Sequence, residues 1–422
     1  MAVKRALDDC FALDAKGQIA LDDALALLRA RIVPVAGVVD ARLDAAAGGI
    51  LAEDVVSPDD LPRFDNAAVD GYAFAGAALA AGGETRLRLR PGRAAAGHPF
   101  ADEVPEGSCV RTLTGAPMPN GTDTVVMQEE AGLEGDAVTV PAGFRAGSNR
   151  RMRGEDIRAG QALFAAGLRL APHHLGVLAG LGGDRVRLRA PLRVALCSSG
   201  DELREPGANL PPGGVYDANR HILKGLLRHL PVTVTDLGIL PDERGKVEAV
   251  LKDAAAAHDL VLASGGASRG DEDHVVRAVE KLGRLHFWRI AMKPGRPLAF
   301  GELGGAVFVG LPGNPVATTV CFLRLARPVL LRLAGSAWTE PKALPVPAAF
   351  TMKKRPGRTE LLRGRLVPGT NGYAVLRIRR EGSGILTSLT DADGLIEIGA
   401  GVEEVKEGDP VPYFSFAELG AL

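Results

Sequence analysis

The first part of the chain alternates between helical and strand-like spacing of apolar residues. Apolar residues at steps of three and four predict an amphipathic helix over residues 21–31 that ends near Pro34: Leu21, Leu25, Leu28 and Ile32. A second helix is predicted over residues 41–51. Helical spacing returns at residues 172–182. We expect these three helices to form one domain that the intervening segment interrupts.

The intervening segment has a different pattern. Between Leu87 and Val140 the apolar residues fall into short alternating runs, such as 108–114 and 123–129, which Gly and Pro interrupt at regular intervals. Alternation with a period of two, bounded by Gly and Pro, is typical of short strands joined by turns. The pattern therefore predicts a small β-rich insertion.

Strands and helices are predicted to alternate between Arg193 and Leu333. Four short apolar segments are each followed by a turn and a helical stretch: Arg193–Cys197, Val232–Thr235, Asp259–Ala263 and Ala306–Val309. Strands this apolar are normally buried on both faces of a parallel sheet, and their connections suit right-handed crossovers. The loops that follow the strands should then meet at one sheet edge, which is where open α/β sheets bind ligands.

After Pro341 the pattern changes again, to Pro, Gly and short alternating segments such as residues 373–378. This pattern predicts a compact β domain, either a barrel or a sandwich. The chain is therefore expected to be a multidomain protein that combines an α/β domain with smaller β domains.

The composition excludes several classes of function but does not identify one. The 422 residues are 46% hydrophobic, enough for several cores, and their formal net charge of -1 gives no electrostatic footprint for nucleic acid or an anionic membrane. The four cysteines are far apart and lack CxxC spacing, so they support neither a zinc site nor a disulfide framework. There is no signal-peptide pattern and no run of about 18 apolar residues. We expect a cytoplasmic protein that binds neither nucleic acid nor membrane.

The loops after the first two predicted strands carry acidic residues. Asp201 and Glu202 directly follow the first strand. There they could hold Mg²⁺ together with water and substrate phosphates, or they could simply face the positive end of a helix dipole. Asp242 follows the second strand just before a helix, where a helix N-cap is the simpler interpretation.

The loops after the third and fourth strands are rich in glycine. The third loop, residues 263–273, combines Ser264, Gly265 and Gly266 with the acidic residues Asp271, Glu272 and Asp273. Glycines let the backbone approach an anion, and carboxylates can hold a cation that neutralises it. A plain turn with a solvated acidic cap is the alternative. The fourth loop, residues 310–319, has a Pro-Gly-Asn-Pro turn before a helix, but it matches neither the Walker nor the GxGxxG spacing.

A cationic segment lies between the third and fourth loops. Arg289, Lys293 and Arg296 fall within residues 287–299, where prolines favour an extended or turning backbone. Three cations at this spacing suit an oxyanion or a phosphate, although each alone would be an ordinary surface charge. Cationic, acidic and glycine-rich loops at one sheet edge together indicate a site for a phosphate-bearing ligand and a divalent metal.

These motifs resemble those of the MoeA family of molybdopterin molybdenumtransferases, which includes the E domain of gephyrin. Residues 64–73, Phe-Asp-Asn-Ala-Ala-Val-Asp-Gly-Tyr-Ala, are similar to the family signature FDNSAMDGYA. Ser264-Gly-Gly, Lys293-Pro-Gly and the turn at residues 310–315 resemble its other landmarks in the same order. The resemblance covers nearly the whole chain, and the ordered set of motifs is far more specific than any one of them.

The resemblance implies an elongated homodimer of four-domain subunits. We expect a discontinuous, elongated helical linker domain over residues 1–57 and 155–190, interrupted by a β-rich insertion domain over residues 58–154. A three-layer α/β domain, with a mostly parallel sheet like that of MogA, would cover residues 191–337. A C-terminal β-barrel-like domain would cover residues 338–422. The active cleft would lie between the α/β domain and the β insertion of the other subunit. Transient contact with other cofactor-biosynthesis proteins is also expected.

The family activity takes molybdopterin adenylate and molybdate, requires Mg²⁺, and releases AMP with the molybdenum cofactor. Carried over motif by motif, the expected catalytic residues are Asp70, Thr114, Asp156, Glu202, Asp273 and Lys293. The expected ligand-binding residues are Arg151, Ser264, Gly265, Gly266, Arg289, Arg296, Pro312, Gly313, Pro315, Arg358 and Ser383. The expected Mg²⁺ ligands are Asp242 and Asp273. For Asp70 alone, a turn formed by Asp-Gly is the alternative interpretation.

The chain departs from the family pattern at three positions. Ala67 and Val69 replace the usual Ser and Met of the signature, and Arg289 stands where a lysine is frequent. Arginine keeps the positive charge of the lysine but changes the geometry and hydration of the cationic group.

Two other functions remain open at this point. The protein could instead catalyse the preceding adenylylation of molybdopterin, or it could act as a binding scaffold like gephyrin.

For the transferase, we expect phosphate and pterin groups on the Ser264 and Pro312 loops. Lys293 and nearby arginines would stabilise charge, and Mg²⁺ would be held by substrate phosphate with Asp242 or Asp273. Phosphoryl chemistry needs mainly positioning and charge neutralisation, so no nucleophile triad is required.

Overall fold

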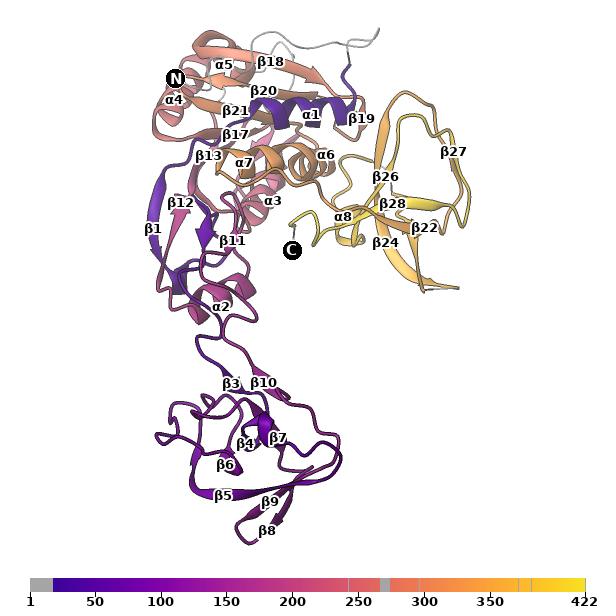
Figure 1. Ribbon diagram of the computed structural model, residues 1–422. Coiled ribbons are helices and arrows are strands. Elements are labelled where there is room, and N and C mark those ends of the chain that lie inside the picture. The colour runs from indigo at the N-terminus through magenta and orange to yellow at the C-terminus, as the bar shows by residue number, and fades with distance from the viewer. Residues whose placement is uncertain are drawn as a thin grey trace. The chain divides into compact units, whose positions relative to one another are not determined.

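The computed structural model describes residues 18–241, 243–265, 274–295, 297–370, 372–380 and 382–421. Contacts divide the chain into two compact units. Unit 1 comprises Met1–Glu53, Ala166–Ala171 and Val186–Leu422, and unit 2 comprises Asp54–Ala165 and Pro172–Arg185. Unit 1 carries the α/β domain and the C-terminal strands, which Figure 1 shows in magenta to yellow. No described helix is both long and apolar enough to cross a membrane.

The α/β domain is built on a six-stranded mixed sheet. Its strands lie in the order β16 (Val232–Ile239), β13 (Leu192–Ser198), β17 (Leu260–Ser264), β21 (Ala306–Leu311), β20 (Pro297–Leu303) and β18 (Gly283–Arg289). The first four are parallel, and β20 is antiparallel to both of its neighbours. The prediction of a mostly parallel sheet from the four apolar segments is therefore confirmed.

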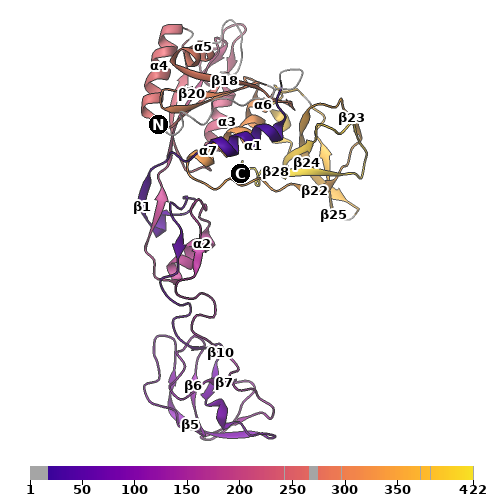
Figure 2. The same ribbon diagram turned by 45° about the horizontal axis from the view of Figure 1, so that its top comes forward.

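Helices cover both faces of this sheet, which makes three layers (Figures 1 and 2). Val194 and Leu196 of β13 pack in one core, whereas Ala195 and Cys197, which alternate with them, pack in the other. The first core includes residues of α1 (Leu21–Arg31), α3 (Ala218–Leu227), α6 (Pro315–Cys321) and α7 (Arg327–Leu333). The second includes residues of α4 (Arg244–Ala257) and α5 (His274–Leu282). The central strands β13, β17 and β21 are buried on both faces and almost entirely apolar, as their sequences indicated, whereas the edge strand β16 is partly exposed and carries Thr and Asp residues.

The predicted helix over residues 21–31 is confirmed, but the one over 41–51 is wrong. Strand β1 (Val38–Arg42) and a short 3₁₀ turn (Leu43–Ala45) stand there instead. Gly48 has a φ of 76°, which a right-handed helix does not accommodate. Ile50 and Leu51 then form antiparallel bridges with Arg169 and Leu188 and are fully buried. Pairing between distant segments overrode the helical spacing.

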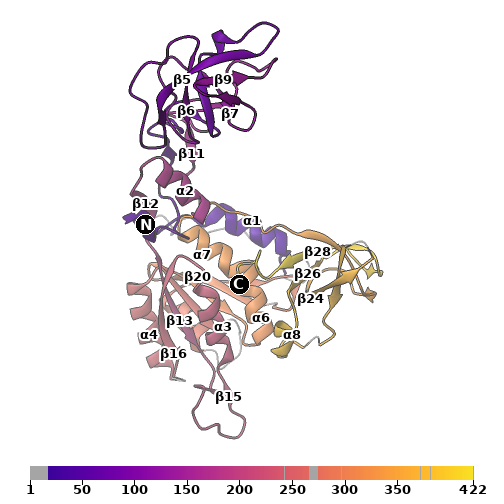
Figure 3. The same ribbon diagram turned by 90° about the horizontal axis from the view of Figure 1, so that it is seen from below.

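The C-terminal β domain confirms the strand-rich prediction for the end of the chain. Its main sheet has the order β19 (Met292–Lys293), β24 (Thr359–Gly369), β26 (Gly394–Ile398), β28 (Pro410–Ser415) and β22 (Leu344–Pro347), with β25 (Gly372–Arg377) also paired to β24. A short pair, β23 (Met352–Lys353) and β27 (Glu404–Val405), and helix α8 (Thr387–Thr390) complete it. Figure 3 shows β24, β26 and β28 beside the end of the α/β domain that carries α6.

Unit 2 contains the predicted β-rich insertion. Its main sheet has the order β7 (Thr124–Met127), β4 (Gly71–Phe74), β6 (Ser108–Thr112), β5 (Thr85–Ala94), β9 (Ala137–Val140) and β8 (Gly132–Glu134). Two short antiparallel strand pairs bring together the segments before and after this sheet: β2 (Val55–Val56) pairs with β11 (Ala162–Phe164), and β3 (Asn66–Ala67) pairs with β10 (Arg150–Arg151). Helix α2 (Pro172–Gly180) confirms the helical spacing predicted there.

Candidate active site

The loops after the parallel strands meet at one edge of the sheet, as predicted. The N–H of Ser199 donates to the carbonyl of Ser264 at 3.0 Å, and the N–H of Gly265 donates to the carbonyl of Leu311 at 3.1 Å. Gly265 has a φ of 91°, and a Cβ there would collide with the carbonyl oxygen of Ser199. Glycine is therefore required at this position both by backbone conformation and by space.

Asn219, at the start of α3, connects two of these loops. Its Nδ2 donates to Ser264 Oγ at 2.9 Å and to the carbonyl oxygen of Gly313 at 2.7 Å. Asn219 is 8% exposed and Ser264 is 2% exposed, so the bond to Ser264 is buried, whereas the bond to Gly313 is partly buried. Hydrogen bonds between buried groups are costly to lose, and this pair fixes the spacing of the two loops.

Strand β19 ties the α/β domain to the C-terminal sheet. It pairs in parallel with β24, and Lys293 lies opposite Glu360 in the register. Glu360 is 5% exposed, and its carboxylate lies 3.7 Å from Lys293 Nζ and 3.6 Å from Arg358 Nε. One buried carboxylate therefore holds two cations in place at the junction of the domains.

A cavity of about 400 Å³ lies at this junction. Its α/β side is lined by Gly265, Met292, Lys293, Pro294, Gly295, Pro312, Gly313, Asn314 and Ala317, and its C-terminal side by Arg358, Leu361, Leu362, Arg363, Arg377, Ile378 and Ser383. The N–H of Val316 donates to the carbonyl of Ser383 at 3.0 Å, which joins the two sides at a second point. Six predicted residues thus line one cavity: Gly265, Lys293, Pro312, Gly313, Arg358 and Ser383.

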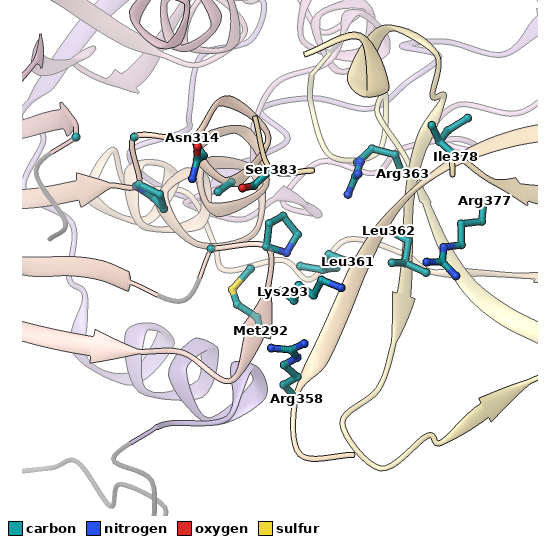
Figure 4. A pocket seen from close by; sticks show the side chains of 16 residues that line it. Met292, Lys293, Asn314, Arg358, Leu361, Leu362, Arg363, Arg377, Ile378 and Ser383 are labelled. Carbon is teal, nitrogen blue, oxygen red and sulfur yellow. The ribbon is translucent and has the colours of Figure 1, made fainter. Parts of the chain in front are cut away.

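The cavity is strongly cationic. Figure 4 shows Lys293, Arg358, Arg363 and Arg377 among the side chains that line it. Burial lowers the pKa of Arg363, and the nearby charge of Arg377 lowers it further. Burial also lowers the pKa of Arg377. Arginine stays protonated in proteins despite such effects, so these like charges create a site that favours an anion such as a phosphate or an oxyanion.

Two further predicted residues are brought together in unit 2. Asp70 Oδ1 accepts from the backbone N–H of Thr114 and from its hydroxyl, both at 2.7 Å. The backbone N–H of Thr114 and then its hydroxyl hold the pKa of Asp70 below its ordinary value, with a smaller contribution from Arg111. The carboxylate is therefore ionised at neutral pH and fixed in orientation.

Arg151 and Asp156 are exposed residues of unit 2, close to the signature segment. Arg151 pairs with Asn66 across β10 and β3, and the N–H of Asp156 donates to the carbonyl of Leu61 at 3.1 Å. Asp65 binds the segment that follows β10, because the N–H of Arg153 donates to its Oδ1 at 2.7 Å. The signature segment and residues 150–156 thus form one hydrogen-bonded structure.

The remaining predicted residues have other placements. Glu202 is exposed in the turn after β13, Arg289 is exposed at the end of β18, and neither lines the cavity. Ser264 acts through Asn219, and Pro315 is the first residue of α6. Asp242, Gly266, Asp273 and Arg296 lie outside the described residues.

Sequence reasoning missed four polar residues at this site. Asn314 and Arg363 line the cavity, as does Arg377, and Asn219 positions two of its loops. Asn314 was within the recognised Pro-Gly-Asn-Pro turn. The signal for Arg363 was an arginine in an otherwise apolar run, Leu361-Leu-Arg-Gly, and that residue is only 4% exposed. Asn219 and Arg377 had no comparable local signal.

The fold and the cavity define the class of protein: a multidomain α/β protein with a cationic cavity between its α/β domain and a C-terminal β domain. Three family models match it, described as MoeA N-terminal region (domain I and II) over residues 19–182, "Probable molybdopterin binding domain" over 195–332, and MoeA C-terminal region (domain IV) over 345–416. The chain belongs to the MoeA family of molybdopterin molybdenumtransferases, which act in molybdenum cofactor biosynthesis.

Relatives support this assignment along most of the chain. A molybdopterin molybdenumtransferase of Haemophilus influenzae is 38% identical and covers 89% of this chain and 93% of its own length. Molybdopterin molybdenumtransferase 2 of Mycobacterium tuberculosis is 31% identical, and the match covers 87% of this chain and 92% of that protein. The crystal structure of a molybdopterin biosynthesis MoeA protein from Pyrococcus horikoshii OT3 has a TM-score of 0.83 at 27% identity, and the match covers 94% of this chain and 100% of that chain.

Proposed function

We propose that this protein inserts molybdate into adenylylated molybdopterin and releases AMP, in a reaction that requires Mg²⁺. The observation that carries the proposal is the cavity at the junction of the α/β and C-terminal domains, with its four cationic side chains. Membership of the molybdopterin molybdenumtransferase family supports it. The substrates bear a phosphoanhydride, a pterin phosphate and an oxyanion, all of which such a cavity can hold.

The residues of the cavity would act by positioning and by neutralising charge. Breaking the phosphoanhydride bond transfers negative charge to the leaving AMP, and fixed cations such as Lys293 and Arg358 would stabilise it. The glycine turns at Gly265 and Gly313 would let backbone approach the phosphate groups. Ser383, from the opposite side, would offer a hydroxyl to the same ligand.

The described residues alone provide no binding site for Mg²⁺. No group of three or more His, Cys, Asp or Glu side chains within the described ranges could hold a metal ion. The buried carboxylate of the site, Glu360, is already engaged by Lys293 and Arg358. We therefore keep the proposal that substrate phosphates hold Mg²⁺ with Asp242 or Asp273, and we assign no step to the metal.

The active form is proposed to be a cytoplasmic homodimer in which the Asp70 and Thr114 loops of one copy complete the cavity of the other. The hydrogen bonds from Thr114 to Asp70 support a functional role, because they fix an ionised carboxylate at the surface of unit 2. Arg151 and Asp156 would belong to the same surface. Transient contact with other cofactor-biosynthesis proteins is part of this proposal.

The test is a defined assay of AMP release from molybdopterin adenylate, with molybdate, with tungstate and with no oxyanion. Release that depends on the oxyanion is expected. Transfer of AMP from ATP to molybdopterin would instead identify the adenylylation step, and no release under any condition would overturn the proposal.

Asp70→Ala should leave a folded protein whose molybdate insertion is lower by about 100-fold, the usual scale for loss of one fixed electrostatic group. Asp136→Ala is the matched control, because Asp136 is an exposed carboxylate of the same unit that pairs with Arg88. Near-normal cofactor formation by Asp70→Ala would remove Asp70 from the scheme without affecting the assay result for the native protein.

A further inference from the structure

A second cationic cleft lies in unit 1, and it shares no lining residue with the active-site cavity. It has a volume of about 660 Å³ and is formed by the segments around β1, Arg169, Leu188–Pro191, the end of α3 and the start of α7. Four arginines and one histidine line it: Arg169, Arg189, Arg228, Arg327 and His229. Among the described residues, no Asp or Glu lines this cleft.

Arg169 is held by hydrogen bonds to the backbone, and Arg327 lies close to the backbone of Gly420. Arg169 donates from Nε to the carbonyl of Gly48 at 3.1 Å and from Nη2 to the carbonyl of His229 at 2.5 Å. The guanidinium of Arg327 lies against Gly420, where a Cβ would come within 2.7 Å of Nε and Nη2. A side chain at position 420 would displace Arg327, so glycine there allows this placement.

Part of the hydrogen-bonding capacity of these arginines is unused in the described part of the chain. Nε of Arg327 and Nε of Arg189 are both buried and have no hydrogen-bond partner in that part of the protein. Burial lowers the pKa of Arg327, the charge of Arg169 lowers it further, and only Glu418 acts in the opposite direction. Burial also lowers the pKa of Arg169. Like charges held together and partly removed from water are unfavourable unless an anion joins them.

Apolar side chains form the rest of the lining. Val39, Leu188 and Leu230 lie in the same cleft as the arginines. The volume falls within the range of small-molecule sites, and a few placed polar groups among apolar ones are usual for such sites. Guanidinium groups pair with phosphate through two parallel hydrogen bonds, which makes clustered arginines a common phosphate site.

We propose that this cleft binds a phosphate-bearing small molecule of nucleotide size, at a site distinct from the active-site cavity. The phosphate lies among Arg169, Arg228 and Arg327, and the remainder of the ligand lies against the apolar residues. The proposal does not depend on the reaction proposed above, because it rests on this cleft alone.

Calorimetric titration of the full-length protein with AMP and, separately, with inorganic phosphate tests the proposal. Because AMP can also enter the active-site cavity, each titration is repeated in Arg358→Gln, which weakens that cavity and leaves the second cleft intact. We expect binding of AMP to persist in Arg358→Gln. Adding Arg228→Gln to that variant should weaken the remaining binding about 10-fold or more, since one charge-assisted contact is lost. Arg228 is exposed, so its replacement should not disturb folding.

Arg327→Gln provides a second, independent variant in the same background and should give a similar loss. Arg244→Gln is the matched control, because Arg244 is an exposed arginine on α4 that lies outside the lining of the second cleft and pairs with Glu248. Phosphate binding that weakens in parallel with AMP identifies the phosphate as the recognised group. The proposal is overturned if Arg358→Gln abolishes AMP binding, or if the remaining binding is unchanged by both Arg228→Gln and Arg327→Gln. It is also overturned if crystals soaked with AMP show it only in the active-site cavity.

Discussion

The two sides of the active-site cavity present different chemistry to a ligand. On the α/β side three glycines line the cavity, Gly265, Gly295 and Gly313, and Lys293 is the charged residue there. On the C-terminal side the lining is made of side chains, with three arginines and a serine: Arg358, Arg363, Arg377 and Ser383. One side therefore depends on conformation and the other on charge.

This difference predicts two kinds of sensitivity to mutation. A backbone surface requires particular φ values and the absence of Cβ atoms, so a single methyl group can displace a whole loop. A surface of arginines loses one contact at a time, and losses at separated residues should combine roughly additively. Substitutions on the two sides can therefore show whether the cavity works as this comparison indicates.

The largest effect is expected from Gly265→Ala. The methyl group would collide with the carbonyl of Ser199, and alanine at a φ of 91° adds backbone strain of about 1–3 kcal/mol. Because a displacement of about 1 Å at a reacting group can lower a rate by about 100-fold, we expect AMP release to fall by that order. Thermal unfolding should show that the protein remains folded.

Gly313→Ala is the control for this prediction. Gly313 lines the same cavity, but its Cβ would meet no atom within 4 Å. Its effect on AMP release should be several-fold smaller than that of Gly265→Ala. Equal losses in the two variants would mean that any added methyl group obstructs the ligand, and that the backbone conformation at Gly265 is not the cause of the loss.

On the cationic side, Arg377→Gln should raise the KM for molybdopterin adenylate by about 10-fold, the scale of one charge-assisted hydrogen bond. The increase should be smaller at high salt, where cations in solution compete for the ligand's phosphates. Arg365→Gln serves as the control, because Arg365 is exposed on β24 and does not line the cavity. An unchanged KM in Arg377→Gln would remove this residue from ligand binding.

Much of the fold could be predicted because its signals are local. The helix over residues 21–31 and the four parallel strands follow from the spacing of apolar residues within each segment. The helix expected over 41–51 was wrong because Ile50 and Leu51 pair with residues more than a hundred positions away. The boundaries expected for the four domains stay a prediction.

The residues of the candidate site could likewise be predicted only where the signal is local in the sequence. The motifs at Gly265, Lys293 and Pro312 were recognised because each is a short run with unusual composition. Arg377 is one arginine in an ordinary alternating strand, and its place beside the cavity depends on how β25 pairs with β24. Asn219 follows the N-cap residue Asp217 in the first turn of a helix, so its sequence position suggested nothing beyond the helix itself.

Asn219→Ala should give the smallest of these effects, a few-fold decrease in AMP release. The substitution removes two hydrogen bonds that space the loops of Ser264 and Gly313, but it adds no clash and removes no charge. Because Asn219 is a positioning residue, the decrease should appear mainly in kcat, with little change in the KM that Arg377→Gln alters. His221→Ala, at an exposed position of the same helix, controls for loss of helix stability. A change in KM as large as that of Arg377→Gln would show that Asn219 contacts the ligand directly, and its assignment as a positioning residue would be wrong.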